Sequence, residues 1–475
     1  MNRISRYLLS AVSALTIATA AQAQAPRPAT AAAPSTASGP ALTGGDLSPL
    51  GYRDPVSRTG GDVSRATVAD GFTFAAGGDL LGPANPLSQQ GDPELNKMLK
   101  LLQDADVGFA NHEGSSFDLP GPTGATQAAQ NGGGYPRITT AINRDLKAMG
   151  INMVSMANNH AGDWGPEGLL ATLATVQASG LVEAGAGASM GDARRPGVVF
   201  TPRGTAALIA TASTFNPATV AADGVGAIKP RPGISVLRAR PVVTVSDEQM
   251  VLMRRLSAAS WSPNYAIRND GPNAVTVGGV TFRTGTGQGL TYNVDKDDRE
   301  AIISSITRAK RGNDMVAFSI HAHEVAATGS TASVADFLPP LFHDAIDAGA
   351  DIVLRHGPHA LGGVEIYKGK PIFYGLNSLF FVVGGIDGAL DPVRRVNTGF
   401  YDNMVAVTEF NGGRPSVVRI YPITTTFDKP ATFGGSRIAT GEDARRILAR
   451  IQKESEPFGT QIKVENDIGV IRIPR

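Results

Sequence analysis

The sequence contains no cysteine among its 475 residues. This absence excludes disulfide bonds, thiolate nucleophiles, cysteine-based zinc sites and lipid attachment through an N-terminal cysteine. Any metal ion that this chain binds must therefore be held by oxygen and nitrogen ligands.

The sequence also lacks an excess of charge of either sign, since 43 basic residues stand against 42 acidic ones. A balanced composition gives no indication of a nucleic-acid partner or of an anionic membrane surface. Beyond the N-terminal region, no apolar run reaches the roughly 20 residues that a membrane-spanning helix needs. With 42% hydrophobic residues, the composition is that of an ordinary soluble protein.

The N-terminal region has the pattern of a secretory signal peptide. Arg3 and Arg6 precede an apolar run over residues 8–21, and Ala21-Gln22-Ala23 is a small-x-small cleavage site. We therefore expect residues 1–23 to be a signal peptide and the mature protein to be exported to the periplasm or beyond. Residues 24–69 read as a low-complexity linker rich in Pro, Ala, Ser, Thr and Gly, and residues 70–475 as the folded domain.

One stretch of the domain organises the rest. Residues 151–157 form a short apolar run that is typical of a buried strand, and this run ends on Asn158-Asn159-His160. A helical pattern then begins with Gly165-Pro166 and stops at Gly180. The polar triplet thus follows the carboxyl end of a strand, which is where open α/β sheets bind their ligands.

The same alternation of strand and helix recurs along the chain and predicts an α/β fold. Residues 214–297 interrupt it, and we expect an irregular insertion there with one helix at 247–258, forming a lid or a specificity surface. The further predicted strands are 72–76, 107–110, 206–210, 315–320, 351–354, 363–367, 371–374, 404–410, 416–421, 461–465 and 469–473, and the further helices are 93–103, 143–149, 298–309, 334–348 and 441–453.

The histidines are concentrated at strand ends. Of the seven in the chain, only His343 lies on a predicted helix. Imidazoles and carboxylates that several strand ends bring together are suited to a divalent-metal site, because each N or O ligand is held by the scaffold. The other six are His112, His160, His321, His323, His356 and His359.

Taken singly, these positions also have plainer explanations. Asp79 follows two glycines, which is equally typical of a turn or a helix cap. Glu113 fits an exposed loop charge, and His112 beside it has no assigned role. His321 and His323 alternate along one strand and face the same side, which fits two ligands or one ligand and one substrate contact. The joint pattern, not any single residue, predicts the metal site.

Six motifs follow one another along the chain: GGD, NHE, ANNHAGDWGPEGLLAT, HAHE, RHGPHALGGVEIYKGKPIFY and GLN. In this order they closely resemble the CapA family of capsule and poly-γ-glutamate biosynthesis proteins, whose domain is related to calcineurin-like metallophosphoesterases. The resemblance runs from about Phe72 to the C-terminus. It implies a four-layer α/β/β/α sandwich with two divalent ions, such as Mn, Fe or Zn, at the strand ends.

The resemblance also implies roles for single residues. His160 corresponds to the catalytic histidine that contacts substrate, and Glu113 to the carboxylate that bridges the two ions. Polar neighbours at the same strand ends, namely Asn158, His323 and Glu324, are expected to contact the substrate. The implied metal ligands are Asp79, Glu113, Asn159, His321, His356 and His359.

The chain departs from the family pattern at three places. Leu81 stands where an Asp-x-His motif has its histidine, so we expect the ion beside Asp79 to have fewer protein ligands and to bind more weakly. The closing histidines are spaced as His356-Gly357-Pro358-His359, one residue wider than Gly-His-x-His. The family's Ser-Leu-Gly-Asn is replaced by residues 375–378, Gly-Leu-Asn-Ser.

Two functions are compatible with these observations. The first is a metal-dependent hydrolase that cleaves a phosphoester or a γ-glutamyl amide bond. The second is a non-catalytic envelope protein that binds or guides an anionic polymer during export. In both cases the expected partners are an anionic polymer such as poly-γ-glutamate and other envelope biosynthesis proteins, with no nucleic acid.

Overall fold

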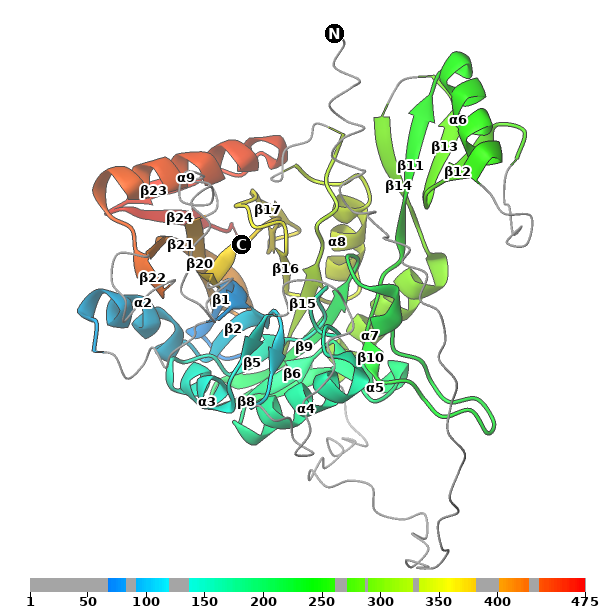
Figure 1. Ribbon diagram of the computed structural model, residues 1–475. Coiled ribbons are helices and arrows are strands. Elements are labelled where there is room, and N and C mark those ends of the chain that lie inside the picture. The colour runs from blue at the N-terminus through cyan, green and yellow to red at the C-terminus, as the bar shows by residue number, and fades with distance from the viewer. Residues whose placement is uncertain are drawn as a thin grey trace, which may run out of the picture. The chain divides into compact units, whose positions relative to one another are not determined.

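In the computed structural model (Figure 1), the chain divides into two units, Met1–Thr59 and Gly60–Arg475. All residues that the structure describes belong to the second unit. The expected signal peptide and most of the linker therefore lie outside the described residues. Within them, no helix is both long and apolar enough to cross a membrane. The structure describes residues 67–82, 91–118, 136–260, 271–286, 289–327, 333–381, 401–426 and 435–474.

The larger sheet has ten strands, and five of them, β1, β2, β5, β6 and β19, run parallel. Their carboxyl ends therefore meet at one edge. The sheet comprises, in spatial order, β23 (Lys463–Glu465), β24 (Ile468–Arg472), β21 (Arg414–Thr426), β20 (Asp402–Asn411), β1 (Phe72–Leu81), β2 (Val107–His112), β5 (Met153–Ser155) and β6 (Val182–Ala184), with β19 (Ser378–Phe381) beside β1 and β22 (Gly435–Ile438) beside β21.

The second sheet has six strands, of which β9, β15, β16 and β18 run parallel. Its predicted hairpin is confirmed, and the turn residues Lys368 and Gly369 both have positive φ, which suits a tight two-residue turn. The strands in spatial order are β17 (Val364–Tyr367), β18 (Lys370–Phe373), β16 (Ile352–His356), β15 (Met315–His321), β9 (Gly204–Ala212) and β8 (Gly197–Thr201).

Alternate side chains of the second sheet point to two different cores. Ala206 and Leu208 belong to a core shared with the larger sheet, whereas Ala207 and Ile209 pack with α7 (Lys296–Gly312) and α8 (Leu338–Asp347). The larger sheet is contacted by α2 (Pro93–Gln103) and α4 (Gly165–Ala178). The fold is thus the expected α/β/β/α arrangement of layers. Further elements are α3 (Thr140–Ala148), α5 (Met190–Ala193), α9 (Gly441–Ser455), β3 (Ser115–Ser116), β4 (Arg137–Ile138) and β7 (Ala186–Gly187).

The helix ends follow from local sequence. The Asp92 side chain accepts hydrogen bonds from the N–H groups of Glu94 and Leu95, and Pro93 begins α2, so the helix starts where it was predicted. Helix α4 stops just before Gly180, which has a φ of +73°. The capping aspartate, the first-turn proline and the terminal glycine all lie next to the helix ends that they determine, so the sequence alone predicts these ends.

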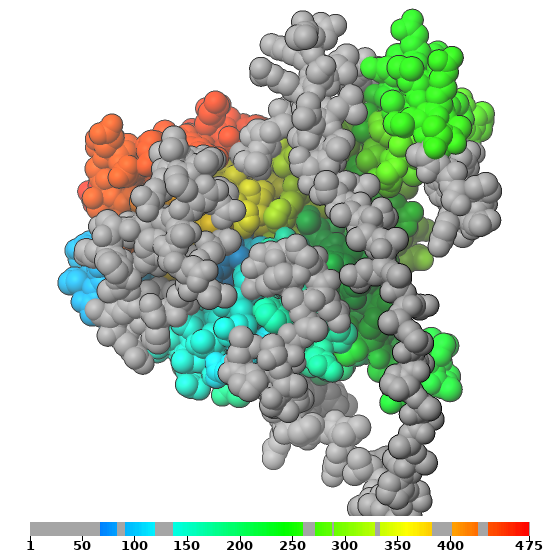
Figure 2. Space-filling view, in the orientation of Figure 1, coloured from blue at the N-terminus to red at the C-terminus, as the bar shows by residue number. Residues whose placement is uncertain are grey.

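The insertion is more regular than the sequence predicts. Residues 239–294 contain a four-stranded sheet and α6 (Asp247–Ser260), and Figure 2 shows this segment in green. The apolar pattern is weak because the core of this sheet is small, with Val245, Met250 and Val275 as its buried members. The strands in spatial order are β12 (Ala274–Val277), β13 (Val280–Thr284), β11 (Ala239–Val245) and β14 (Gly289–Val294), and the rest of the insertion has only η1 (Pro217–Thr219) and β10 (Gly233–Ile234).

Candidate metal centre

The carboxyl ends of strands from both sheets meet at one place. Asp79 lies near the end of β1, and Glu113 directly follows β2. His321 and His356 are the last residues of β15 and β16 and stand opposite each other in the parallel register. Side chains that are far apart in the sequence are thereby brought together.

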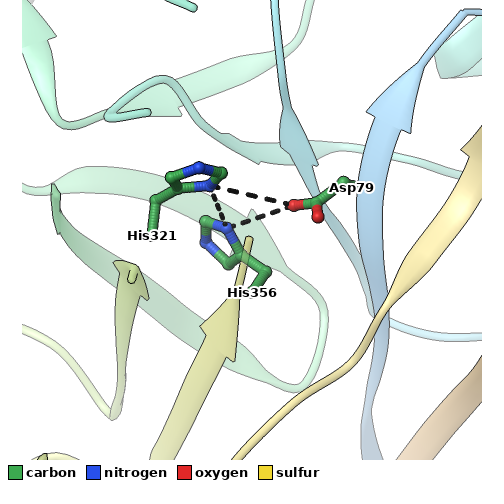
Figure 3. Close-up of side chains that lie close together, drawn as sticks. All are labelled: Asp79, His321 and His356. Carbon is green, nitrogen blue, oxygen red and sulfur yellow. Dashed lines mark hydrogen bonds and ion pairs between the residues drawn. The ribbon is translucent and has the colours of Figure 1, made fainter. Parts of the chain in front are cut away.

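Asp79, His321 and His356 form a first donor set, in which each residue offers one ligand atom within 4.8 Å of the others (Figure 3). His356 Nδ1 lies 3.3 Å from Asp79 Oδ1 and 3.1 Å from His321 Nδ1. All three side chains are fully buried. The first set is therefore closed to bulk water.

Neighbouring groups hold the first set in place. Asn111 Nδ2 donates to Asp79 Oδ1 over 2.8 Å, and the N–H of Gly357 donates to Asp79 Oδ2 over 3.1 Å. A hydrogen bond of 2.8 Å between Ser319 Oγ and His356 Nε2 turns Nδ1 of that ring toward Asp79. Such outer partners fix the orientation and tautomer of a histidine ligand.

Glu113, His323 and His359 form a second donor set with the same 4.8 Å limit. Glu113 is buried, whereas His323 and His359 are partly exposed. His321 lies between the two sets, because its Nε2 is 2.9 Å from His323 Nε2 while its Nδ1 faces His356. The second set is therefore the more accessible of the two.

The electrostatics of the two sets differ. Burial alone would raise the pKa of Asp79, but the contacts with His356, His359 and Asn111 together outweigh it and lower this pKa. Burial, together with the charge of Asp79, raises the pKa of Glu113 well above its ordinary value. Burial also lowers the pKa of His321 well below its usual range and that of His323 to about 4. Neutral imidazoles with available lone pairs are the form that ligates metal.

These residues fit divalent cations. Both carboxylate oxygens of Glu113 are buried and have no hydrogen-bond partner among the described residues. A buried carboxylate in this condition is costly unless a positive charge balances it. Nitrogen and oxygen donors in two sets of three are also the ligand types that first-row divalent metals take.

His160 lies at the accessible side of the centre, and its side chain is 24% exposed. Its Nδ1 is 2.7 Å from Asp163 Oδ2, and its Nε2 is 3.9 Å from Glu113 Oε1. Asn158 supports it by accepting the His160 N–H over 3.1 Å and by donating to the His112 carbonyl over 2.8 Å. The Asn159 Oδ1 is buried without a hydrogen-bond partner in the described residues, which leaves it available as a ligand.

Other candidates lie outside both sets. The Glu324 carboxylate accepts hydrogen bonds from Ser213 and Thr214 over 2.6 and 3.0 Å, so it supports a loop. His112 Nε2 lies 3.1 Å from the side-chain Oδ1 of Asn143. His343 is on α8, as predicted, with Nε2 2.8 Å from Glu365.

The expected shortage of ligands beside Asp79 does not appear in the structure. Leu81 is buried and pairs with Phe381 of β19. His321 and His356 nevertheless complete a set of three around Asp79. Gly357, with a φ of +110°, lets the chain turn between His356 of the first set and His359 of the second.

The sequence pattern did not single out three residues that the structure brings to the centre. They are Asn111, Asp163 and Ser319. Asn111 stands two residues before Glu113, and Asp163 three residues after His160, so proximity to a predicted ligand was the available signal. Ser319 likewise stands two residues before His321, but the sequence does not show that its hydrogen-bond partner is His356 on the neighbouring strand.

Replacement of Gly357 by alanine is expected to disturb both sets. An added Cβ would stand 2.9 Å from His323 Cδ2 and 3.1 Å from His321 Cε1, at a positive φ that disfavours side chains. We expect a loss of about 1–3 kcal/mol in stability from overpacking and strain and a lower metal content, measured by thermal melting and elemental analysis. Gly226→Ala is the control, since its φ is +59° and nothing lies within 4 Å; an equal effect of both changes would show that the clash at the centre is unimportant.

The layered fold and the site together define a metallophosphoesterase-like α/β protein with candidate metal-binding sets. The family model described as bacterial capsule synthesis protein PGA_cap matches residues 61–381, and the chain belongs to this family.

Curated relatives agree with this assignment. The uncharacterized protein y4sH of Sinorhizobium fredii is 34% identical over 454 residues, which cover 87% of this chain and 96% of that protein. A probable polyglutamine synthesis accessory protein of Mycobacterium tuberculosis is 25% identical over 51% of this chain and 48% of its own length. The PGA biosynthesis protein CapA of Bacillus subtilis is 32% identical over 24% of this chain and 30% of its own length.

Proposed function

We propose that this protein is an exported, metal-dependent hydrolase that acts in capsule or poly-γ-glutamate biosynthesis. The observation that carries the proposal is the pair of donor sets, Asp79–His321–His356 and Glu113–His323–His359, at the meeting strand ends. The family and the printed names of its relatives support the link to the polymer.

The residues of the centre have distinct tasks. The two donor sets would hold the ions, with Asn159 Oδ1 as a further oxygen. Divalent ions supply Lewis-acid chemistry, since they make water a better nucleophile at neutral pH and neutralise negative charge on the attacked group. Asp163 Oδ2 lies 2.7 Å from Nδ1 of His160 and fixes the orientation of the ring. The Nε2 of His160 is thereby directed to the centre, where it donates a proton to the leaving group.

We propose a phosphoester or a γ-glutamyl amide as the bond that is cleaved. Both reactions develop negative charge on an oxygen of the attacked group and require a proton for the leaving group. Elemental analysis of the purified protein, followed by turnover tests on an aryl phosphate and on γ-glutamyl oligomers, separates the two substrates. Bound metal without turnover of either would favour the non-catalytic polymer-binding function.

We expect the two ions to dissociate in order, with the ion of the second set leaving first. The first set is fully buried, whereas His323 and His359 are partly exposed. Calorimetric titration of metal into stripped protein should therefore show two separated steps. His359→Ala should weaken the binding of the ion that mild chelation removes first. If mild chelation instead removes the ion beside Asp79 first, the predicted order is wrong.

We also expect the exported protein to be cleaved after Ala23, because Ala21-Gln22-Ala23 follows a basic start and a short apolar run. Mass spectrometry of the protein from the envelope or secreted fraction would show a chain that begins at Gln24. A chain that retains Met1 in that fraction would contradict the cleavage.

A further inference from the structure

Arg355 has the largest fully buried side chain among the described residues. It is part of β16, directly before the donor His356. No carboxylate of the described residues forms an ion pair with its guanidinium. Burial lowers the pKa of Arg355 to about 10, which reflects the unfavourable transfer of the charge out of water.

The guanidinium donates to three main-chain carbonyl oxygens. Its Nε donates to Ala322 over 3.1 Å, one Nη to Glu324 over 2.7 Å and the other Nη to Tyr374 over 3.2 Å. Two of these acceptors are the residues on either side of His323. The guanidinium of Arg355 therefore binds the main chain immediately before and immediately after His323.

A second contact fixes the same segment from another side. The N–H of His323 donates to Thr214 Oγ1 over 2.9 Å, and this hydroxyl donates to the Glu324 carboxylate over 3.0 Å. The N–H of Ala322 donates to the His356 carbonyl over 3.0 Å. Strand β15 ends at His321, so His323 lies beyond its regular strand pairing. The hydrogen bonds just described therefore fix the main chain at His323.

A buried charge is weak evidence for a role in stability, because apolar residues of similar volume are often as good or better. What the arginine offers here is geometry, since its planar fork spreads five N–H groups over three nitrogens that each reach a different carbonyl, whereas the three N–H groups of a lysine all start from one nitrogen. The arrangement is thus suited to positioning the segment that carries His323.

We propose that Arg355 is a positioning residue that fixes residues 322–324 and thereby holds His323 in the second donor set. This inference rests on the proposed function in taking that set as a metal-binding one. Arg355 acts on His323 through the main chain and does not touch the reacting groups. Its replacement therefore weakens the second set and leaves the first set in place.

The test uses Arg355→Lys, with Arg194→Lys as the matched control. Arg194 is also largely buried, but it pairs with Asp298 away from the centre. Thr214→Val is a second variant, which removes the other contact to His323 and leaves the buried charge intact. In metal-free full-length protein, the imidazole ¹⁵N signals of His323 and the hydrogen exchange of amides 322–324 report whether the segment is held.

We expect Arg355→Lys and Thr214→Val to shift the His323 signals and to speed exchange in 322–324, while Arg194→Lys does neither. In Mn²⁺ or Zn²⁺ titrations, the weaker of the two steps should lose roughly 10–100-fold in affinity, the range for outer partners of a metal ligand. The tighter step should stay within about twofold, well under that range. If Arg355→Lys fails to fold, the same readouts on Thr214→Val decide.

Unchanged His323 signals and exchange in the folded variants would overturn the positioning role. Equal weakening of both steps would overturn it too, because it would mean a general structural effect. A wild-type protein that binds neither Mn²⁺ nor Zn²⁺ would instead refute the proposed function, and the metal-free measurements would still test the hold of Arg355 on His323. The two failures are therefore distinguishable.

Discussion

Glu113→Gln is expected to remove the ion of the second donor set and to abolish hydrolysis. The buried Glu113 oxygens face the centre without a hydrogen-bond partner in the described residues, and a neutral amide with an N–H donor cannot balance a cation as a carboxylate does. Loss of an outer partner of a ligand costs up to about 100-fold in metal affinity or activity, so loss of the ligand itself should exceed this. Elemental analysis and turnover measure both effects.

The control for this change is Glu183→Gln. Glu183 is another largely buried glutamate, whose pKa is raised by burial, but it lies on β6 beside Gln177. Metal content and turnover should not change there. Without metal, Glu113→Gln should melt no lower than the wild type, because burial and the charge of Asp79 already disfavour a negative charge at this position and the amide carries none. Wild-type metal content in Glu113→Gln would refute the ligand role.

The strand ends were mostly predictable from the sequence, because short apolar runs and glycine or proline boundaries are local features. The C-terminal end of β1 could not be predicted in this way. Gly77 and Gly78 look like the start of a turn, yet β1 continues to Leu81. The reason is a long-range one, since a Cβ at Gly78 would lie 1.7 Å from the Asn377 carbonyl oxygen. The glycine serves a close approach between segments about 300 residues apart in the sequence, which local pattern cannot reveal.

The grouping of the ligands was also beyond the sequence. Strand-end position identifies His321, His323, His356 and His359 as members of one centre, but each set draws on residues from both sheets. Which histidine joins which carboxylate depends on how the sheets pack. The same reason explains why Leu81 seemed to leave Asp79 short of a ligand, although His356 from the other sheet lies 3.3 Å from it.

The departure at residues 375–378 has a structural counterpart as well. The Asn377 carbonyl accepts the Asp79 N–H over 2.9 Å, and Ser378 Oγ lies 3.4 Å from His359 Nδ1. Asn377 adopts a φ of +58°, a conformation that asparagine tolerates better than most residues. The altered motif therefore supports one residue of each donor set through main-chain and hydroxyl contacts.

His160→Ala is expected to lower kcat by about 10²–10⁴-fold, the usual contribution of a general acid or base, while metal content stays at the wild-type level. The reason is geometric, because Nε2 lies 3.9 Å from Glu113 Oε1 and the partly exposed side chain stands beside both donor sets without belonging to either. Asp163→Asn should give a smaller loss in the same direction, since the ring stays beside the centre but loses the carboxylate that orients it. Steady-state kinetics with elemental analysis of each variant measure these effects.

The matched control is His343→Ala, because His343 has a similar carboxylate partner, Glu365 at 2.8 Å, but lies on α8 outside both sets. Its kcat should stay at the wild-type value. A substrate with a leaving group that needs no proton sharpens the test, since His160→Ala should then lose much less activity. An equal loss on both substrates would assign His160 to substrate binding or charge stabilisation, and metal loss in His160→Ala would instead make it a ligand. Only the leaving-group dependence, with metal retained, fits an imidazole that Asp163 orients as a proton donor.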